Sequence, residues 1–413
     1  MTAGGARSRD EDRFCRDRPT VLAYSVLVCF TFWNYAYGPA LTLLRGELDF
    51  SYTMLGVYTA AWSGGTVLTG LTFPALARRL PRGTLLWGSA LLAVAGAALF
   101  GWGSGIPPTL AGAGVLGFGG TLLLTVVQAI LSDRHNLRRD RALTEANIGA
   151  AASAVLAPLA LGAVAGGPLG WRVAFALPGI GLAGLYVRYR RQPLSTSARP
   201  QRARGQGGLP LASCLFCGLV AASMAVEFCL VYFGAEQLRV LGMSTTTAAT
   251  AMSSHYLGLL IGRVGGAIVT RRPGRTVALL HASLATTAGG FLLFWLTARP
   301  SVAAIGLLLA GVGIANLYPL ALALALDAAP GREDRANSLG QLLGGLLVVT
   351  APYLLGRLAD RLGLTAAFTI EPVLIGMCLL LLLAGLRARH TGVRPPLRDD
   401  QCAQSRTPSP RLQ

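Results

Sequence analysis

The chain has 413 residues, of which 53% are hydrophobic and 13% are charged. Soluble globular proteins carry about a quarter charged residues, so this composition excludes an ordinary water-soluble protein. The formal net charge of +18 is compatible with a nucleic-acid surface or with a membrane protein, and the distribution of the charge decides between them.

Apolar runs of about twenty residues recur along the chain, each long enough to cross a hydrocarbon core of about 30 Å. The first run is too long for a signal-peptide core and lacks a cleavage site, so we expect it to remain in the mature protein. The twelve predicted transmembrane helices are 20–44, 52–76, 84–100, 109–131, 142–165, 171–187, 210–235, 245–269, 276–298, 301–326, 336–355 and 365–386.

The arginines lie mainly in the two chain ends and in every second connection between the predicted helices. By the positive-inside rule, these segments and both termini are expected in the cytoplasm. The pattern indicates a multi-pass protein of the cell membrane, a bacterial inner membrane in our interpretation, and no nucleic-acid partner. The ends 1–19 and 387–413, rich in charged and small polar residues, are predicted to be disordered cytoplasmic tails.

The two halves of the chain are related by an internal repeat at an offset of about 194 residues. Asp140, Arg141, Pro158 and Gly162 match Asp334, Arg335, Pro352 and Gly356. RRLPR at 78–82 likewise matches RRPGR at 271–275. We therefore predict an all-α protein with six-helix bundles at 20–187 and 210–386, joined by a cytoplasmic linker at 188–209. Two such bundles can rock about a site at mid-membrane.

This duplicated layout resembles the major facilitator superfamily along essentially the whole chain. The resemblance implies a loop pattern of Gly, three residues, Asp, Arg, any residue, Gly and then basic residues after helices 2 and 8. Arg78 and Thr270 replace the Asp, which in the family helps to hold the bundles in one state, so any charge lock here must use other partners or be weaker. The helix 5 signature survives only as Pro158 and Gly162. The retained loop positions are Arg79, Arg82, Gly266, Arg271, Gly274 and Arg275.

Glu227 is the single acid near the middle of a predicted span, and Glu371 lies in the outer part of another. Ionisable groups inside a membrane are costly and usually face an interior or a watery cavity. Glu227 is therefore the main candidate for proton coupling, with substrate contact and a structural hydrogen-bonded acid as alternatives. Asn34 occupies the matching position in the first half and is expected to face the same cavity.

Several aromatic and polar side chains also lie near mid-depth. They are predicted either to line a substrate cavity or to pack between helices. His255 could relay a proton with Glu227, or bond to a neighbouring helix. The cavity candidates, besides Asn34, are Trp33, Tyr35, Trp62, Asn316 and Tyr318.

Basic residues around the repeated loops form a candidate inner gate. Arg263 lies eight residues before Arg271, about 12 Å along a helix. It either organises this gate, as LIGRVGG suggests by resemblance to a helix 8 pattern of the family, or extends to the membrane interface. The gate candidates are Arg78, Arg79, Arg82, Arg263, Arg271, Arg272 and Arg275.

Other apparent motifs have simpler explanations. GAGVLGFGG at 112–120 matches a dinucleotide fingerprint but lies inside a predicted helix with no preceding strand, so close helix packing is expected. Cys214 and Cys217 lack a second pair of metal ligands. No P-loop or hydrolase motif is present. We expect no enzyme activity, no cofactor and no metal.

The sequence thus predicts a secondary transporter of a small organic molecule that works by alternating access, acts as a monomer and is driven by protons. Export is preferred by resemblance to bacterial efflux members. With one central carboxylate, the cavity would suit a neutral or weakly cationic compound. Import of a sugar or other polar metabolite is the alternative within this class, and a membrane sensor or scaffold without transport is the alternative of another class.

Overall fold

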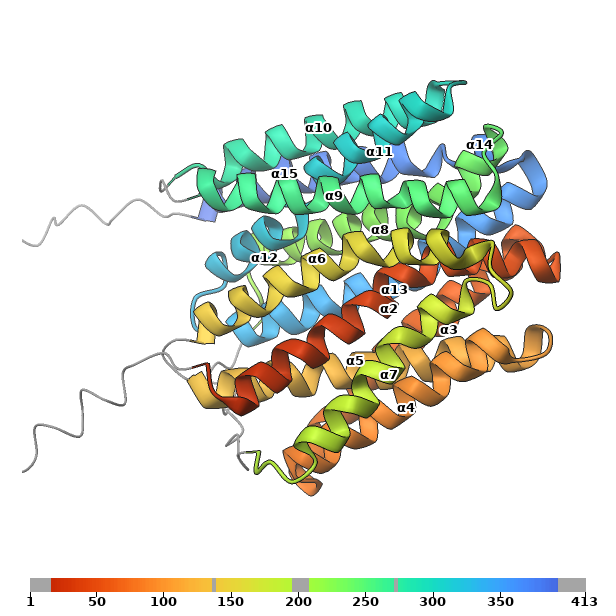
Figure 1. The fold of residues 1–413 in the computed structure, drawn as a ribbon. Coiled ribbons are helices and arrows are strands. Elements are labelled where there is room, and N and C mark those ends of the chain that lie inside the picture. The colour runs from red at the N-terminus through yellow and green to blue at the C-terminus, as the bar shows by residue number, and fades with distance from the viewer. Residues whose placement is uncertain (1–15, 136–138, 195–207, 271–273, 393–413) are drawn as a thin grey trace, which may run out of the picture.

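The computed structural model describes residues 16–135, 139–194, 208–270 and 274–392, and these parts of the chain form helices without strands. The helices are nearly parallel or antiparallel and form two bundles lying side by side (Figure 1). The first bundle contains α2 (Arg18–Leu48), α3 (Tyr52–Arg79), α4 (Arg82–Trp102), α5 (Ile106–His135), α6 (Arg139–Ala165) and α7 (Arg172–Tyr189). The second contains α8 (Leu211–Val240), α9 (Thr245–Val269), α10 (Thr276–Leu296), α11 (Pro300–Ile314), α12 (Leu317–Asp327), α13 (Glu333–Leu362), α14 (Leu364–Ala367) and α15 (Ile370–Gly392).

Local sequence signals explain several helix boundaries. The Asp17 carboxylate accepts a hydrogen bond from the Thr20 amide and caps α2. Ser51 and Ser244 cap α3 and α9 in the same way. Such caps satisfy amide groups that have no partner within the helix. They set the points at which the chain turns back into the bundle.

Two predicted helices are interrupted in the structure. The predicted span 301–326 is present as one apolar span, but its helix divides into α11 and α12 around Asn316. The Asn316 amide donates to the Gly262 carbonyl at 3.0 Å, which ties the break to α9. The predicted span 365–386 similarly begins with the short α14. Its main helix α15 continues to Gly392, so the first residues of the predicted tail are helical.

Small residues let neighbouring helices approach closely. A Cβ on Gly112 or Gly119 would overlap the backbone of α4, which confirms the packing role predicted for the glycine run 112–120. Gly290 and Gly306 hold α10 and α11 together in the second bundle in the same way. Such contacts replace the hydrophobic driving force that is missing between helices in lipid.

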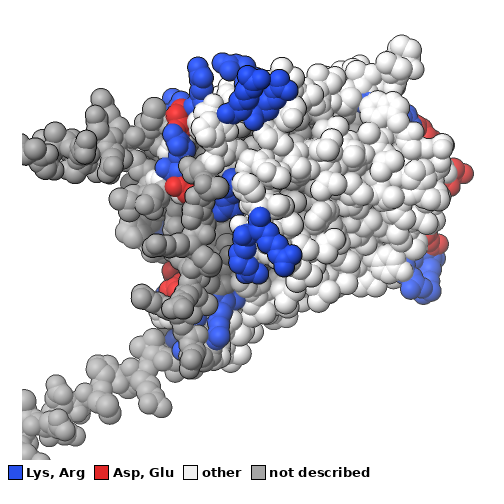
Figure 2. Space-filling model, turned by 90° about the horizontal axis from the view of Figure 1, so that it is seen from below, with Lys and Arg blue, Asp and Glu red and all other residues white. Residues whose placement is uncertain are grey.

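The outer surface agrees with a membrane location. Nine helices of the described chain are long and apolar enough to span a membrane, counting α11 and α12 as one. Figure 2 shows arginines gathered towards one end, a broad uncharged belt, and a few charged residues at the other end. We call the end that carries Arg78, Arg79 and Arg275 the basic end, and the opposite one the far end.

Candidate functional site

Polar side chains from both bundles meet near the middle of the helices. Glu227 lies on α8 and Arg263 on α9, both in the second bundle, whereas Tyr35 lies on α2 in the first. The Arg263 guanidinium interacts with the Tyr35 hydroxyl across the interface, and the Glu227 carboxylate interacts electrostatically with both groups. An acid and a base on one bundle are thus joined to a hydroxyl group on the other.

Three further side chains extend this group. The Tyr35 ring contacts Tyr256 edge-on, with 4.9 Å between ring centroids. The Tyr318 hydroxyl accepts a hydrogen bond of 2.6 Å from the Gln341 amide. Tyr256 and Tyr318 both interact electrostatically with Glu227. We call Tyr35, Glu227, Tyr256, Arg263, Tyr318 and Gln341 the interface cluster.

Most members of the interface cluster are accessible to solvent, whereas Tyr256 is buried. Arg263 and Gln341 are exposed, and Glu227, Tyr35 and Tyr318 are half-buried. Because Arg263 binds Tyr35 across the interface, its exposed surface faces the space between the bundles. A charged pair with solvent access at mid-depth is typical of a transport pathway, since such groups are costly when they face lipid.

At the far end, by contrast, the two bundles touch through their backbones. A Cβ on Gly38 of α2 would overlap the Val231 carbonyl of α8. Gly162 and Gly356, which the repeat relates to each other, meet Thr250 of α9 and the Tyr52 backbone of α3. These three contacting helix pairs close this end of the interface.

Charged groups reinforce the same closure. Arg45 of α2 pairs with the buried Glu236 of α8 at 2.9 Å, and Arg239 also contacts Glu236, at 3.2 Å. The Asp360 carboxylate of α13 accepts hydrogen bonds of 2.9 and 2.7 Å from the first two amides of α3, where a negative charge is favourable. We call these contacts, together with those of the glycines, the far-end closure.

Comparison with known proteins agrees with this architecture. The family model described as Major Facilitator Superfamily matches residues 23–333 and 215–410. The chain belongs to the major facilitator superfamily. It is a membrane transporter and not an enzyme. A search of curated proteins finds no match.

Solved transporter structures share the major facilitator fold at low sequence identity. A bacterial homologue of the human lysosomal transporter Spinster, inward-facing and unoccupied, aligns with a TM-score of 0.74 and 15% identity, over 96% of this chain and 100% of that one. A variant of the nucleoside transporter NupG aligns with a TM-score of 0.71 and 13% identity, over 90% of this chain and 100% of that one. A variant of the peptide transporter POT aligns with a TM-score of 0.70 and 16% identity, over 90% of this chain and 95% of that one.

Within this facilitator fold, two of the predicted cavity residues pack inside the first bundle. Trp33 is fully buried, and its indole donates a hydrogen bond of 2.8 Å to the Phe175 carbonyl of α7. Trp62 is 4% exposed and packs on Tyr37, with ring centroids 4.4 Å apart. Both rings therefore pack between helices in this structure, which is one of the two roles predicted for them.

Replacing Trp33 with Phe tests whether Trp33 packs between helices and does not contact the transported molecule. The substitution removes the indole hydrogen bond and some buried volume, which costs about 1 to 3 kcal/mol. We expect a lower melting temperature in detergent and an unchanged affinity for any transported compound. A weaker affinity for the transported compound, without a lower melting temperature, would show instead that Trp33 contacts that compound.

His255 and Asn316 also have structural partners. His255 is fully buried, with Nδ1 3.3 Å from the Leu307 carbonyl of α11, and the electrostatic partner of Glu227 is Arg263 instead. The proposed relay through His255 is therefore not supported. Asn316 is 8% exposed and holds the α11–α12 break. Asn34 is half-buried, and its neighbour Tyr35 is the α2 residue that reaches Glu227.

The predicted inner-gate residues do not form one group. Arg82 pairs with Asp133 of α5 at 3.2 Å, within its own bundle, and Arg78 and Arg79 are exposed in the last turn of α3. Arg275 is exposed at the start of α10. Arg263 instead joins the interface cluster. Arg271 and Arg272 lie outside the described residues.

Sequence reasoning missed two members of the interface cluster and most of the far-end closure. Gln341 is an amide inside an apolar helix, a signal that was available but was not used. Tyr256 follows His255 directly in the sequence and is not among the predicted site residues. Glu236 and Asp360 lie near predicted loops, where acids are common, and only the fold shows that they contact the other bundle.

Proposed function

We propose that this transporter exports a small organic molecule in exchange for protons, by alternating access, and that Glu227 carries the proton. The observation that carries the proposal is the interface cluster, in which Arg263 links the Glu227 carboxylate to a hydroxyl group of the other bundle. The far-end closure and the exposed Arg263 and Gln341 support a state that is open at the basic end. With the basic end in the cytoplasm, this state is inward-open.

Proton binding has a direct structural consequence in this arrangement. A charged Glu227 attracts Arg263, and this attraction is stronger than in water because the surroundings are partly desolvated. A neutral Glu227 no longer competes with Tyr35 or with a bound molecule for the guanidinium. Protonation therefore changes how firmly α9 is attached to α2, which are the helices that must separate when the bundles rock.

The same cluster narrows the substrate class. Arg263 balances the charge of Glu227, so the site is neutral overall rather than acidic. Tyr35, Tyr256 and Tyr318 add aromatic surface and hydroxyl groups. These features suit a polar organic molecule that is neutral or zwitterionic, and the named cargoes of two similar structures, nucleosides and peptides, are of this kind. Export rests on resemblance to bacterial efflux members.

Transport in proteoliposomes tests the proposal. Thermal shift over a panel of metabolites and antibiotics first identifies ligands. Under an imposed pH gradient, a ligand should move against the proton flux, and addition of the ligand should itself release protons across the membrane. Co-transport of ligand and proton in one direction would support the import alternative. A ligand that binds but neither moves nor displaces protons would support the sensor or scaffold alternative.

A further inference from the structure

A pocket lies on the periphery of the first bundle, away from the interface cluster. It has a volume of about 880 Å³ and is lined by residues of α4 and α7 and of the segment that follows α7. In Figure 1, α4 and α7 form the edge of the molecule opposite α10 and α11. The pocket therefore opens towards the surrounding lipid and not between the bundles.

The pocket runs along the two helices as a groove. On α4 the lining extends from Gly83 through Trp87 to Val94, and on α7 from Gly179 to Tyr186, with Arg190 directly after the helix. Eleven residues of helix correspond to about 16 Å, and one leaflet of a hydrocarbon core is about 15 Å thick. The groove therefore extends from the basic end to about mid-membrane, which is the length occupied by one acyl chain.

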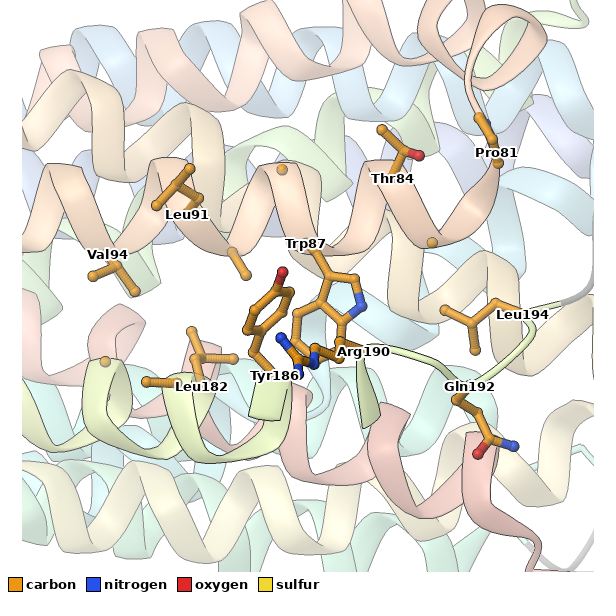
Figure 3. Close-up of a pocket in the computed structure, with 15 residues that line it drawn as sticks. Pro81, Thr84, Trp87, Leu91, Val94, Leu182, Tyr186, Arg190, Gln192 and Leu194 are labelled. Atoms are coloured by element: carbon orange, nitrogen blue, oxygen red, sulfur yellow. The ribbon is translucent and has the colours of Figure 1, made fainter. Parts of the chain in front are cut away.

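The character of the groove changes along its length. Leu91, Val94 and Leu182 lie at one end, and Thr84, Gln192 and Leu194 at the other, with Trp87, Tyr186 and Arg190 drawn between them (Figure 3). Trp87 and Tyr186 contact each other edge-on, with ring centroids 5.1 Å apart. Amphipathic rings of this kind favour the headgroup level of a membrane.

The charge of the groove selects the type of occupant. Its fifteen lining residues include one cation, Arg190, and no acid. Arg190 is exposed at the carboxyl end of α7, directly beside Arg191 and near Arg188. A basic side chain that closes an apolar groove at the membrane surface is complementary to an anionic headgroup.

We propose that this groove binds one phospholipid with an anionic headgroup from the leaflet at the basic end. One acyl chain lies between α4 and α7 against Trp87, and Arg190 and Gln192 hold the headgroup phosphate. Gly88 provides the space, because a Cβ at this lining residue would meet no atom within 4 Å. The inference does not depend on which molecule is transported.

Brominated lipids measure this binding through the quenching of tryptophan. The signal of Trp87 is obtained as the difference between the parent protein and its Trp87→Phe variant, in phosphatidylcholine bilayers with increasing brominated phosphatidylglycerol or brominated phosphatidylcholine. We expect the anionic lipid to bind about fivefold more tightly, the effect of one basic side chain near an anionic surface. Arg190→Gln should remove this preference, and Arg191→Gln, a neighbouring cation outside the pocket, should retain it.

Gly88→Leu tests the acyl-chain part of the groove. It should abolish the preference and the retention of one phosphatidylglycerol in native mass spectra. Gly184→Leu is the matched control, because Gly184 is also exposed on α7 with free space but lies outside the groove. Equal quenching of Trp87 by both lipids in the parent protein would show that the groove has no preference for an anionic headgroup, and this would overturn the proposal. A protein dimer that disappears in Gly88→Leu would also overturn it, in favour of a second copy of the chain.

Discussion

Glu227→Gln is expected to abolish proton-driven transport while substrate exchange without a gradient is partly retained. Glutamine keeps the shape and hydrogen-bonding capacity of a protonated glutamate but carries no exchangeable charge. Arg263 then loses its electrostatic partner Glu227 and keeps its interaction with Tyr35. Accumulation of ligand under an imposed pH gradient, compared with exchange of radiolabelled ligand at equal pH, measures the two activities.

A fully buried acid in the same bundle provides the control for this experiment. Glu371 of α15 is fully buried, and neither oxygen has a hydrogen-bond partner among the described residues. Glu371→Gln removes a carboxyl group from the same bundle without touching the interface cluster, so proton-driven accumulation should persist. If Glu227→Gln transports like the parent protein and Glu371→Gln does not, the coupling site lies on α15.

Gly38→Leu is expected to slow transport strongly by destabilising the far-end closure. A leucine at this position would meet the Val231 carbonyl and the Tyr232 backbone of α8. Forcing a large side chain into a packed contact costs about 1 to 3 kcal/mol, so the state closed at the far end should become about 5- to 150-fold rarer. The transport rate should fall in proportion, while ligand binding from the far side is retained.

Accessibility of Thr42 reports the same change. Thr42 is fully buried one turn beyond Gly38, on the α2 face that meets the second bundle. In a Thr42→Cys background, Gly38→Leu should increase labelling by a membrane-impermeant maleimide from the far side. Gly64→Leu on α3 is the control, since a Cβ there has free space, and labelling should be unchanged. Equal labelling of both variants would show that the glycine contact does not close the interface.

The sequence predicted the class of fold because apolar length and repeated loops are local signals. Helix breaks were harder to predict. The division of 301–326 around Asn316 depends on a hydrogen bond to Gly262, 54 residues away in the chain, and the local hydropathy there is that of a continuous helix. Likewise, Glu236 and Asp360 gain their role from the partner bundle, which no local pattern reports.

For the site, the sequence indicated which residues are ionisable but not which way their side chains point. Glu227 and Arg263 were conspicuous because ionisable residues are rare in apolar spans, yet their proximity follows from the packing of α8 against α9. Aromatic residues gave a weaker signal: Trp33 and Tyr35 are two positions apart, and a helix turns by about 200° between them. One therefore enters the bundle core and the other reaches Arg263.

The central claim is that protonation of Glu227 determines how the bundles are arranged. Spin labels on Ile148→Cys of α6 and Ile268→Cys of α9, both exposed towards the basic end, allow double electron–electron resonance to follow the opening in lipid nanodiscs. We predict a distance distribution that shifts with pH in the parent protein and is independent of pH in Glu227→Gln. A pH shift of the same size in Glu227→Gln would contradict the account.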